Sequence, residues 1–342
     1  VYLDEKHMIH EEIITTDEEN AVKAAILLHD IGHGPFSHAL ENTLVQDIYH
    51  EEISLMMMHK INAEIGGKLD LAIRIFTNQY PKQYLHQLVS GQLDMDRLDY
   101  LSRDSFFCGV SEGIIGASRI IKMLNVHDGK LVVEAKGIYS IEKFLVARRL
   151  MYWQVYLHKT SIAAEKMLTN ILKRAKELAL NNVELFAPDA LKYFLYNDIR
   201  KNNFETSELA LNNFALLDDS DFFSSIKMWI KHPDFVLSTL CNNFINRKLF
   251  KVEILTEINV GKRRKEEWIE KYKQHFNISK HDAEYFIGEE IVSTDTYSAE
   301  DDNINILQKD GSVKDVADSS DMLNIQVLTK KVEKHYLCYY RY

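Results

Sequence analysis

Apolar and polar residues alternate with helical spacing from Thr16 onward, and this pattern predicts the first helix of the chain. Thr16 followed three residues later by Glu19 is a capping box, which favours a helix start. Apolar residues recur at helical spacing from Val22, and His29, seven residues later, lies on the same face. His29 is therefore predicted to point into the core. We expect the helix to end near Gly32, because glycine commonly follows the last periodic residue.

Further along the chain, short apolar runs around two Asp-Gly pairs predict β-hairpins over residues 125–134 and 303–316. Helical spacing covers residues 141–180, alternation over 248–259 indicates a strand, and residues 322–342 are typical of strands. The chain has only four prolines and no low-complexity tract, which favours a compact, mostly helical protein. We therefore expect a mainly α fold with small β-hairpins and a mixed α/β C-terminal region.

Length and charge narrow the class of protein. The chain has 342 residues and a formal net charge of −10, a length that holds one large or two ordinary domains. The acidic balance argues against broad nucleic-acid binding, although a local basic pocket can still hold phosphates. The absence of an apolar run of about 18 residues predicts no membrane span. Three widely spaced cysteines without zinc-site spacing favour a reducing compartment, so we expect a cytoplasmic protein.

The highest density of candidate metal-binding and proton-transferring residues follows the first predicted helix, in the sequence HDIGHGPFSH over residues 29–38. Three histidines and an aspartate beside two glycines and a proline suit a metal site that handles protons. Neighbouring imidazole and carboxylate groups such as His29 and Asp30 bind one divalent cation if the helix end lets them converge. An aspartate near a helix C-terminus opposes the macrodipole, and a bound cation relieves that penalty. The alternative for a bare His-Asp pair is a core histidine beside a helix-end carboxylate.

A second acidic stretch, SGQLDMDRLDYLSRD, covers residues 90–104. On a helix, Asp96, Tyr100 and Asp104 recur at i, i+4 and i+8 and therefore lie along one face. Carboxylates and a tyrosine on one face, with an arginine beside them, suit a sugar-phosphate pocket next to a metal. The alternative is an amphipathic helix with a solvated acidic face.

Two further elements carry candidate groups. Arg148, Tyr156 and Lys159 recur on one face of the helical region 141–180, a pattern that alone is typical of a solvated face. His50 starts another predicted helix, where the helix dipole reduces the tendency of a histidine to be cationic. The alternative for His50 is a surface helix start with acidic residues in its first turn.

Together these motifs resemble the signature of the HD-domain metal-dependent phosphohydrolases. The resemblance is to the deoxynucleoside triphosphate triphosphohydrolase (dNTPase) branch, which includes bacterial dNTPases and the catalytic domain of the vertebrate SAM-and-HD-domain dNTPase. It implies an HD-domain helical bundle and one divalent metal ion (Mg, Mn, Fe, Co or Zn) held by His29, Asp30 and Asp96. It also implies a further histidine ligand in a segment upstream of the metal-binding pair. Val1-Tyr2-Leu3 resembles the continuation of that segment. We therefore expect that the sequence lacks its first residues.

The resemblance also implies roles for residues around that metal. His33, His38 and His50 would orient the nucleophile, stabilise the phosphate and protonate the leaving oxygen. The residues matching phosphate and sugar contacts are Arg97, Tyr100, Asp104, Arg148, Tyr156 and Lys159. The sequence departs from the family at Leu157, where the family has glutamine, and at Arg97, where the vertebrate enzyme has lysine. Arginine keeps the charge but forks differently toward phosphate oxygens.

The resemblance is strong over residues 1–180, the predicted HD catalytic core. Over residues 181–342, a predicted C-terminal helical region with a small β-containing end, it holds only in general layout. It implies hydrolysis of a dNTP to deoxynucleoside and tripolyphosphate, by a homo-oligomer (dimer or tetramer) that a nucleotide can activate. Two alternatives stay open. One is another HD-type phosphohydrolase, such as a nucleotidase or phosphodiesterase, and the other is a non-catalytic nucleotide-binding HD protein.

Overall fold

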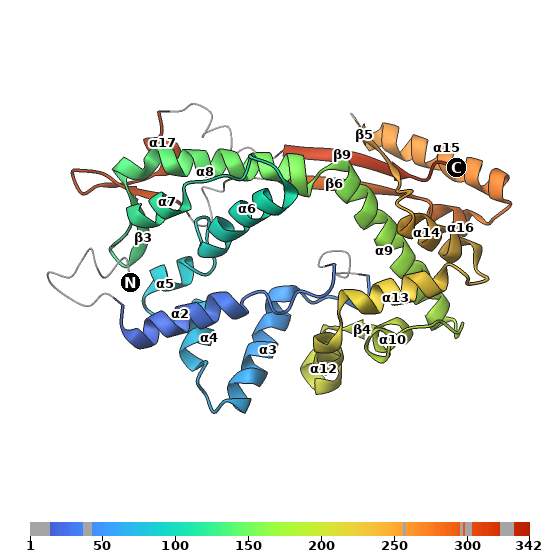
Figure 1. Ribbon diagram of the computed structural model, residues 1–342, viewed down its shortest axis with the longest axis horizontal. Helices are drawn as coiled ribbons and strands as arrows, with labels where there is room; N and C mark the ends of the chain where they lie inside the picture. Colours follow the sequence, from blue (N-terminus) through green and yellow to red (C-terminus); the bar gives the residue numbers. More distant parts are fainter. Residues whose placement is uncertain (1–13, 37–42, 256–257, 295–296, 298–302, 322–331) are drawn as a thin grey trace. The chain divides into compact units, whose positions relative to one another are not determined.

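The computed structural model describes residues 14–36, 43–255, 258–294, 297, 303–321 and 332–342. Helices dominate these residues, which confirms the predicted mainly α fold (Figure 1). No helix in this part of the chain combines the length and the apolar character needed to cross a membrane.

The chain forms two compact units, each assembled from three separate segments. The first unit consists of Val1–Ile31, Ser54–Tyr156 and Ser293–Val332, and the second of Gly32–Ile53, Leu157–Val292 and Glu333–Tyr342. The predicted boundary at residue 180 separates functional regions, and it stays a prediction. Each of the two compact units contains segments from both sides of that residue.

Helices and a four-stranded sheet build the first unit. Its helices are α2 (Thr16–Leu28), α4 (Asp70–Phe76), α5 (Gln83–Gln87), α6 (Met95–Cys108), α7 (Ala117–Met123), α8 (Ile138–Met151) and α17 (Val316–Ser319). α3 (His50–Glu64) begins in a segment of the second unit and continues in a segment of the first. Each of these helices contributes a fully buried side chain to one core, and these side chains are Ala25, Met58, Ile75, Leu85, Leu101, Ile120, Phe144 and Val316. Burial of this apolar face is what holds α2 and α6, and hence the motifs at their ends, in place.

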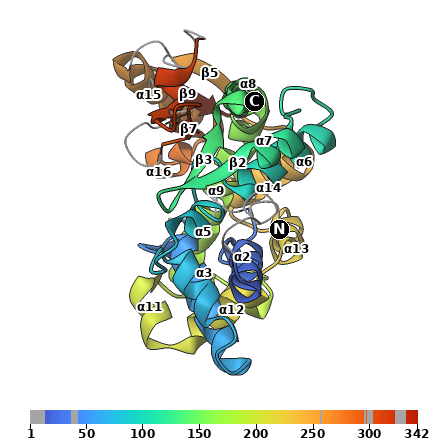
Figure 2. The ribbon, with the colours of Figure 1, turned by 90° about the vertical axis from the view of Figure 1, so that its left-hand side faces the viewer.

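The sheet of the first unit confirms both predicted hairpins. Its strands are β2 (Leu124–His127), β3 (Lys130–Glu134), β7 (Asn305–Leu307) and β8 (Val313–Asp315), in the order β2-β3-β7-β8. Asp128 and Gly129 join β2 to β3 with positive φ at both positions, as a type I′ turn requires. β3 pairs in parallel with β7, so residues far apart in the sequence form one sheet (Figure 2).

The second unit is mostly helical and contains α9 (Lys159–Leu180), which packs against α14 (Phe235–Ile245). Its other helices are α10 (Asp189–Tyr196), α11 (Lys201–Thr206), α12 (Glu208–Leu216), α13 (Asp219–Trp229), α15 (Ile258–Phe276) and α16 (Lys280–Glu284). β1 (Val45–Gln46) pairs in parallel with β4 (Ile199–Arg200). A three-stranded sheet joins β5 (Lys251–Leu255), β9 (Val332–Tyr339) and β6 (Ile287–Thr294). The predicted strand over 248–259 is therefore shorter, and of the predicted strand region 322–342 the part 322–331 lies outside the described residues.

The predictions for two helical regions need correction. The N-cap of α2 is Thr15, whose hydroxyl accepts from the Glu18 backbone, so the capping box lies one residue before the predicted pair. α2 also ends at Leu28, with His29 as its C-cap, rather than near Gly32. The helical region predicted over 141–180 is interrupted after α8 by η3 (Tyr152–Tyr156), a π-helical turn, and α9 starts afresh with His158 as its N-cap.

Candidate metal centre

The end of α2 orients the first two candidate ligands. His29 is the C-cap of α2, and its Nδ1 lies 2.7 Å from the carbonyl oxygen of Ile26. Because a carbonyl only accepts hydrogen bonds, Nδ1 carries the proton and donates it. The lone pair of Nε2 is then left for a metal, which is the arrangement typical of histidine ligands. Asp30 follows directly in the turn after the helix.

The start of α6 supplies the third candidate ligand. Asp94 is the N-cap of α6, is almost fully buried, and accepts hydrogen bonds from the backbone N–H of Arg97 at 2.7 Å and of Gly91 at 3.1 Å. This cap fixes the first turn of α6, in which Asp96 stands. The helix ends at Cys108 and its C-cap is Gly109, whose positive φ of 68° is the left-handed conformation that glycine adopts readily.

His29, Asp30 and Asp96 converge within the first unit. The Nε2 atom of His29 lies 3.4 Å from Oδ2 of Asp30 and 3.8 Å from Oδ2 of Asp96, and one ligand atom from each residue lies within 4.8 Å of the others. One imidazole nitrogen and two carboxylates form a donor set that suits a divalent cation. The residues present therefore fit a metal ion at the place where the sequence predicts one.

The charge balance of this cluster supports the same conclusion. The facing Asp96 carboxylate and, more weakly, the charge of Asp30 outweigh burial and raise the pKa of His29 to about 9. Two carboxylates thus stabilise positive charge at Nε2, where a proton and a metal ion compete for one lone pair.

The helix that carries Asp96, α6, and the segment after α8 bring the predicted sugar-binding residues together. The hydroxyl of Tyr156 donates a hydrogen bond of 2.7 Å to Oδ2 of Asp104. The rings of Tyr100 and Tyr156 meet edge to face, with centroids 6.2 Å apart. Burial is the main cause that raises the pKa of Tyr100 to about 12, and burial together with Asp104 raises the pKa of Tyr156. Both phenols therefore remain hydrogen-bond donors at neutral pH.

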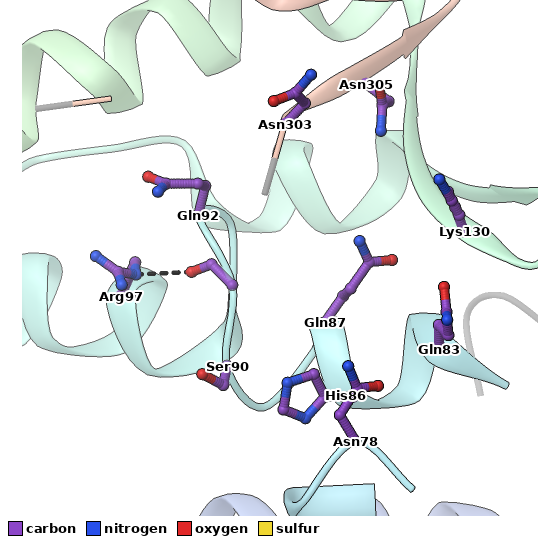
Figure 3. Close-up of a pocket in the computed structure, with 11 residues that line it drawn as sticks. Asn78, Gln83, His86, Gln87, Ser90, Gln92, Arg97, Lys130, Asn303 and Asn305 are labelled. Atoms are coloured by element: carbon purple, nitrogen blue, oxygen red, sulfur yellow. Dashed lines mark hydrogen bonds between the residues drawn. The ribbon is translucent and has the colours of Figure 1, made fainter. Parts of the chain in front are cut away.

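The two predicted phosphate-binding arginines of the first unit are both anchored. Arg148 is 7% exposed, and its Nη1 donates to Oε1 of Gln92 at 3.1 Å. The Nε–H of Arg97 donates to the carbonyl oxygen of Gly91 at 2.8 Å (Figure 3) and to Oδ2 of Asp94 at 3.0 Å. The sequence did not single out Gln92, because a lone glutamine before a helix carries no signal until its partner on α8 is known.

The remaining predicted residues lie in the second unit or outside the described residues. His33 and His50 stack with ring centroids 3.8 Å apart and an interplanar angle of 18°. Lys159 is exposed in the first turn of α9. His38 and Val1-Tyr2-Leu3 lie outside the described residues.

Known proteins match the chain along most of its length. The family model described as HD domain matches residues 6–104, and the one described as HD associated region matches residues 115–193. A phosphohydrolase of Bacteroides thetaiotaomicron with a solved crystal structure is 56% identical, and the match covers 99% of this chain and 83% of that one with a TM-score of 0.94.

Two curated relatives match more distantly. The uncharacterized protein YwfO of Bacillus subtilis is 33% identical over 243 residues, 68% of this chain and 53% of its own length. A Dictyostelium discoideum protein named deoxynucleoside triphosphate triphosphohydrolase SAMHD1 homolog is 28% identical over 225 residues, 60% of this chain and 43% of its own length. The chain thus spans about half the length of these relatives. The near-complete match to the solved phosphohydrolase and the HD match spanning all three candidate ligands confirm the resemblance, and the chain belongs to the HD-domain phosphohydrolase family.

Proposed function

We propose that this chain catalyses metal-dependent hydrolysis of deoxynucleoside triphosphates to deoxynucleoside and tripolyphosphate. One observation carries the proposal: the neighbours His29 and Asp30 converge on one point in the first unit with Asp96, which is distant from them in sequence. In support, the Dictyostelium relative is named as an enzyme of this activity.

In this proposal His29, Asp30 and Asp96 are metal ligands of the protein. A divalent cation held by these residues would supply Lewis-acid chemistry, which would polarise a phosphoryl oxygen and make a nearby water more acidic. The hydrogen bond to the Ile26 carbonyl keeps the His29 ring in the orientation that presents Nε2. The nitrogen and oxygen donors are compatible with Mg, Mn, Fe, Co or Zn.

The spacing along α6 relates the metal ligand to the proposed sugar contacts. Asp96, Tyr100 and Asp104 are spaced four residues apart on α6. Each is therefore about 6 Å further along the same helix face than the one before it. A phosphate at Asp96 would therefore be followed along the helix by a sugar at Tyr100 and Asp104. Because Tyr156 donates to Oδ2 of Asp104, the carboxylate is fixed and its Oδ1 is oriented to accept a sugar hydroxyl.

The reaction needs both charge neutralisation and a proton. Water adds to the α-phosphorus, the bond from that phosphorus to the 5′ oxygen breaks, and the 5′ oxygen takes up a proton. We assign the neutralisation of the triphosphate to Arg97, Arg148 and Lys159. We assign nucleophile orientation and proton delivery to His33, His38 and His50, because imidazole exchanges protons near neutral pH.

The activity of the whole protein is part of the same proposal. By analogy with the dNTPase branch, we propose a cytoplasmic homo-oligomer, a dimer or tetramer, with nucleotide activation. Size-exclusion chromatography with light scattering, with and without added dNTP, tests the assembly.

The decisive experiment compares two aspartates of α6 in the protein that contains this chain. We expect Asp96→Asn to lower dNTP turnover by more than about 100-fold, since removing a ligand should exceed the loss typical of an outer-shell change. Asp99→Asn is the matched control, because Asp99 is exposed on the same helix and, among the described residues, its carboxylate pairs with Arg103 alone. Chromatography of the products of all four dNTPs identifies the bond that breaks.

Each outcome of that experiment is informative. Deoxynucleoside with tripolyphosphate supports the proposal, whereas orthophosphate or a nucleoside monophosphate indicates another HD-type phosphohydrolase. Binding of dNTP without any product, in metal-loaded protein, indicates a non-catalytic nucleotide-binding protein. Equal loss in Asp96→Asn and Asp99→Asn would contradict the role of Asp96 as a ligand.

A further inference from the structure

A buried lysine of the second unit has no role in the chemistry proposed above. Lys176 stands toward the end of α9 and is 8% exposed. Its Nζ donates to the carbonyl oxygens of Phe194 at 2.6 Å, Asn197 at 2.7 Å and Leu44 at 3.3 Å. An ammonium group has three N–H donors, so these three oxygens engage all of them. Lys176 therefore holds together the main-chain segments that carry these oxygens.

Two of the three carbonyl groups belong to the end of α10. Phe194 lies in the last turn of that helix, and Asn197 is its C-cap. Carbonyl groups in the last turn of a helix have no partner within the helix, and they carry the negative end of its dipole. Burying such oxygens costs free energy unless a donor reaches them. The Lys176 ammonium is that donor, and it fixes the end of α10 to α9.

The third carbonyl group belongs to a segment far away in the sequence. Leu44 is 1% exposed and directly precedes β1, and Asn197 lies two residues before β4. β1 and β4 pair in parallel over only two residues each, and a pairing of that length is marginal by itself. Because Lys176 contacts both Leu44 and Asn197, it joins the two chains at the point where both strands begin.

A second lysine joins the same two chains beyond the strands. β4 continues into α11, whose first residue is Lys201, and the chain after β1 continues into α3. The Nζ of Lys201 donates to Oε1 of Glu52 in the first turn of α3. The other carboxylate oxygen of Glu52 accepts from the backbone N–H of Tyr49 at 3.3 Å. Residues 44–52 are therefore attached at both ends, by Lys176 and by Lys201.

His50 lies between these two attachments. Its ring stacks on the ring of His33, with centroids 3.8 Å apart. A displacement of about 1 Å would forfeit much of the attraction between the two rings. Lys176 contacts the backbone six residues before His50, and Lys201 contacts the side chain two residues after it. The two lysines therefore act on the ring through the chain that carries it.

We propose that Lys176 and Lys201 are positioning residues for His50. They attach residues 44–52 to α9, α10 and α11 and so keep the His50 ring stacked on His33, in the place where it orients the nucleophile or transfers a proton. Lys176 has the larger effect, because it is buried and makes three hydrogen bonds. The Lys201 side chain is 41% exposed and makes an ion pair, which is a weaker attachment. This inference rests on the catalytic role proposed for His50.

The test measures kcat and KM for dNTP hydrolysis in two backgrounds of the protein that contains this chain. With His50 intact, Lys176→Met should lower kcat by about 10-fold or more, because a small misplacement of a reacting group is costly. KM should change by less than about 2-fold, since no proposed phosphate or sugar contact is removed. In a His50→Ala background, Lys176→Met should lower the residual kcat by less than about 2-fold, because residues that act as a unit are not additive.

Two further variants complete the kinetic test. Lys201→Gln should lower kcat by about 2- to 5-fold, the size expected for a partly exposed ion pair. Lys201→Arg retains a donor for Glu52 and should bring kcat to within about 2-fold of the wild type. Lys227→Met is the matched control, since Lys227 is exposed on α13, and it should change kcat by less than about 2-fold in both backgrounds. Circular dichroism checks that each variant is folded.

A second readout needs no turnover. Each ring of the stack lies in the ring current of the other, so the imidazole NMR resonances of His50 report on the stack. In Lys176→Met, and to a smaller extent in Lys201→Gln, these resonances should move toward their positions in His33→Ala. They should stay in place in Lys227→Met.

The outcomes separate this inference from the proposed function. Equal losses of kcat in both backgrounds would mean that the lysines act on the fold as a whole, and they would overturn the positioning role. Unmoved His50 resonances in folded Lys176→Met or, where that variant does not fold, in Lys201→Gln would also overturn it. A wild-type protein that hydrolyses no dNTP would contradict the proposed function, and the resonances would still decide whether the lysines hold the stack.

Discussion

Two charged clusters, one in each unit, differ in how their charges are balanced. In the second unit the Arg174 guanidinium, 11% exposed, pairs with Asp234 at 2.6 Å and with Asp282 at 3.0 Å. Nearby on α9, the Lys176 ammonium donates to the carbonyl oxygens of Phe194 at 2.6 Å and Asn197 at 2.7 Å. Each of these cations meets acceptors that the protein itself supplies.

In the described part of the first unit, by contrast, hydrogen-bond acceptors are brought together without a cation of the protein between them. His29, Asp30 and Asp96 direct one nitrogen lone pair and two carboxylates toward one point, so acceptors meet acceptors. Only a proton or another cation relieves that arrangement. The comparison teaches that a closed network of donors and acceptors is structural, whereas converging acceptors indicate a ligand.

The largest expected effect concerns the metal. Mn²⁺ at a thousand times its Kd should stabilise the wild-type protein by about 4 kcal/mol, because it binds only the folded state. At the same Mn²⁺ concentration, Asp30→Asn should lose most of this stabilisation because one of the ligands is weakened. Thermal unfolding with Mn²⁺ and with EDTA measures both. The same metal-dependent gain in both proteins would mean that Asp30 is no ligand.

The opposite behaviour is expected of the Arg174 cluster. Arg174→Met should destabilise the protein by about 3 kcal/mol, since it leaves the partly buried Asp234 and Asp282 without their cation. Its metal content should not change. Urea denaturation measures the free energy of unfolding, and elemental analysis measures the bound metal. A variant that keeps its stability but loses its metal would erase the distinction between the two clusters.

The smallest expected effect concerns Glu18 in the first unit. It tests whether the hydrogen-bond network of Glu18 is structural, as the Arg174 cluster of the second unit is. The Glu18 carboxylate is buried, which works to raise its pKa. Its hydrogen bonds from Lys82, Tyr80 and the Thr15 backbone outweigh burial and lower the pKa below the ordinary 4.5. The stabilisation is therefore complete above pH 4.5 and is lost as the pH falls through the lowered value.

Glu18→Gln should accordingly cost about 1 kcal/mol at neutral pH and much less near pH 3. Urea denaturation of both proteins at the two pH values measures this difference. A cost that stays constant with pH would show that the carboxylate charge plays no part in holding the start of α2.

The features predicted correctly from sequence are those with local causes. The Asp128-Gly129 turn follows from the φ values it needs, and His29 and Asp30 are adjacent at a helix end. The capping box was misplaced because Thr15 with Glu18 and Thr16 with Glu19 have the same spacing. The choice between them depends on Tyr80 and Lys82, more than sixty residues away, which bind Glu18.

Long-range features explain the other differences. The parallel pairing of β3 with β7, the contact of Gln92 with Arg148 and the assembly of each unit from three segments join residues that no local pattern relates. The convergence of Asp96 with His29 was predicted through the family resemblance, and the catalytic roles assigned to these residues stay predictions.

Because Tyr152–Tyr156 forms a π-helical turn, the position of the Tyr156 side chain depends on the number of residues in that turn as well as on their types. A π turn holds an extra residue compared with an ordinary helical turn. Deleting one residue there would restore regular winding and rotate everything beyond the deletion by about 100° around the helix axis. The Tyr156 hydroxyl would then swing away from Asp104 with every functional group still present, so insertions and deletions in this turn should be tolerated far less well than substitutions.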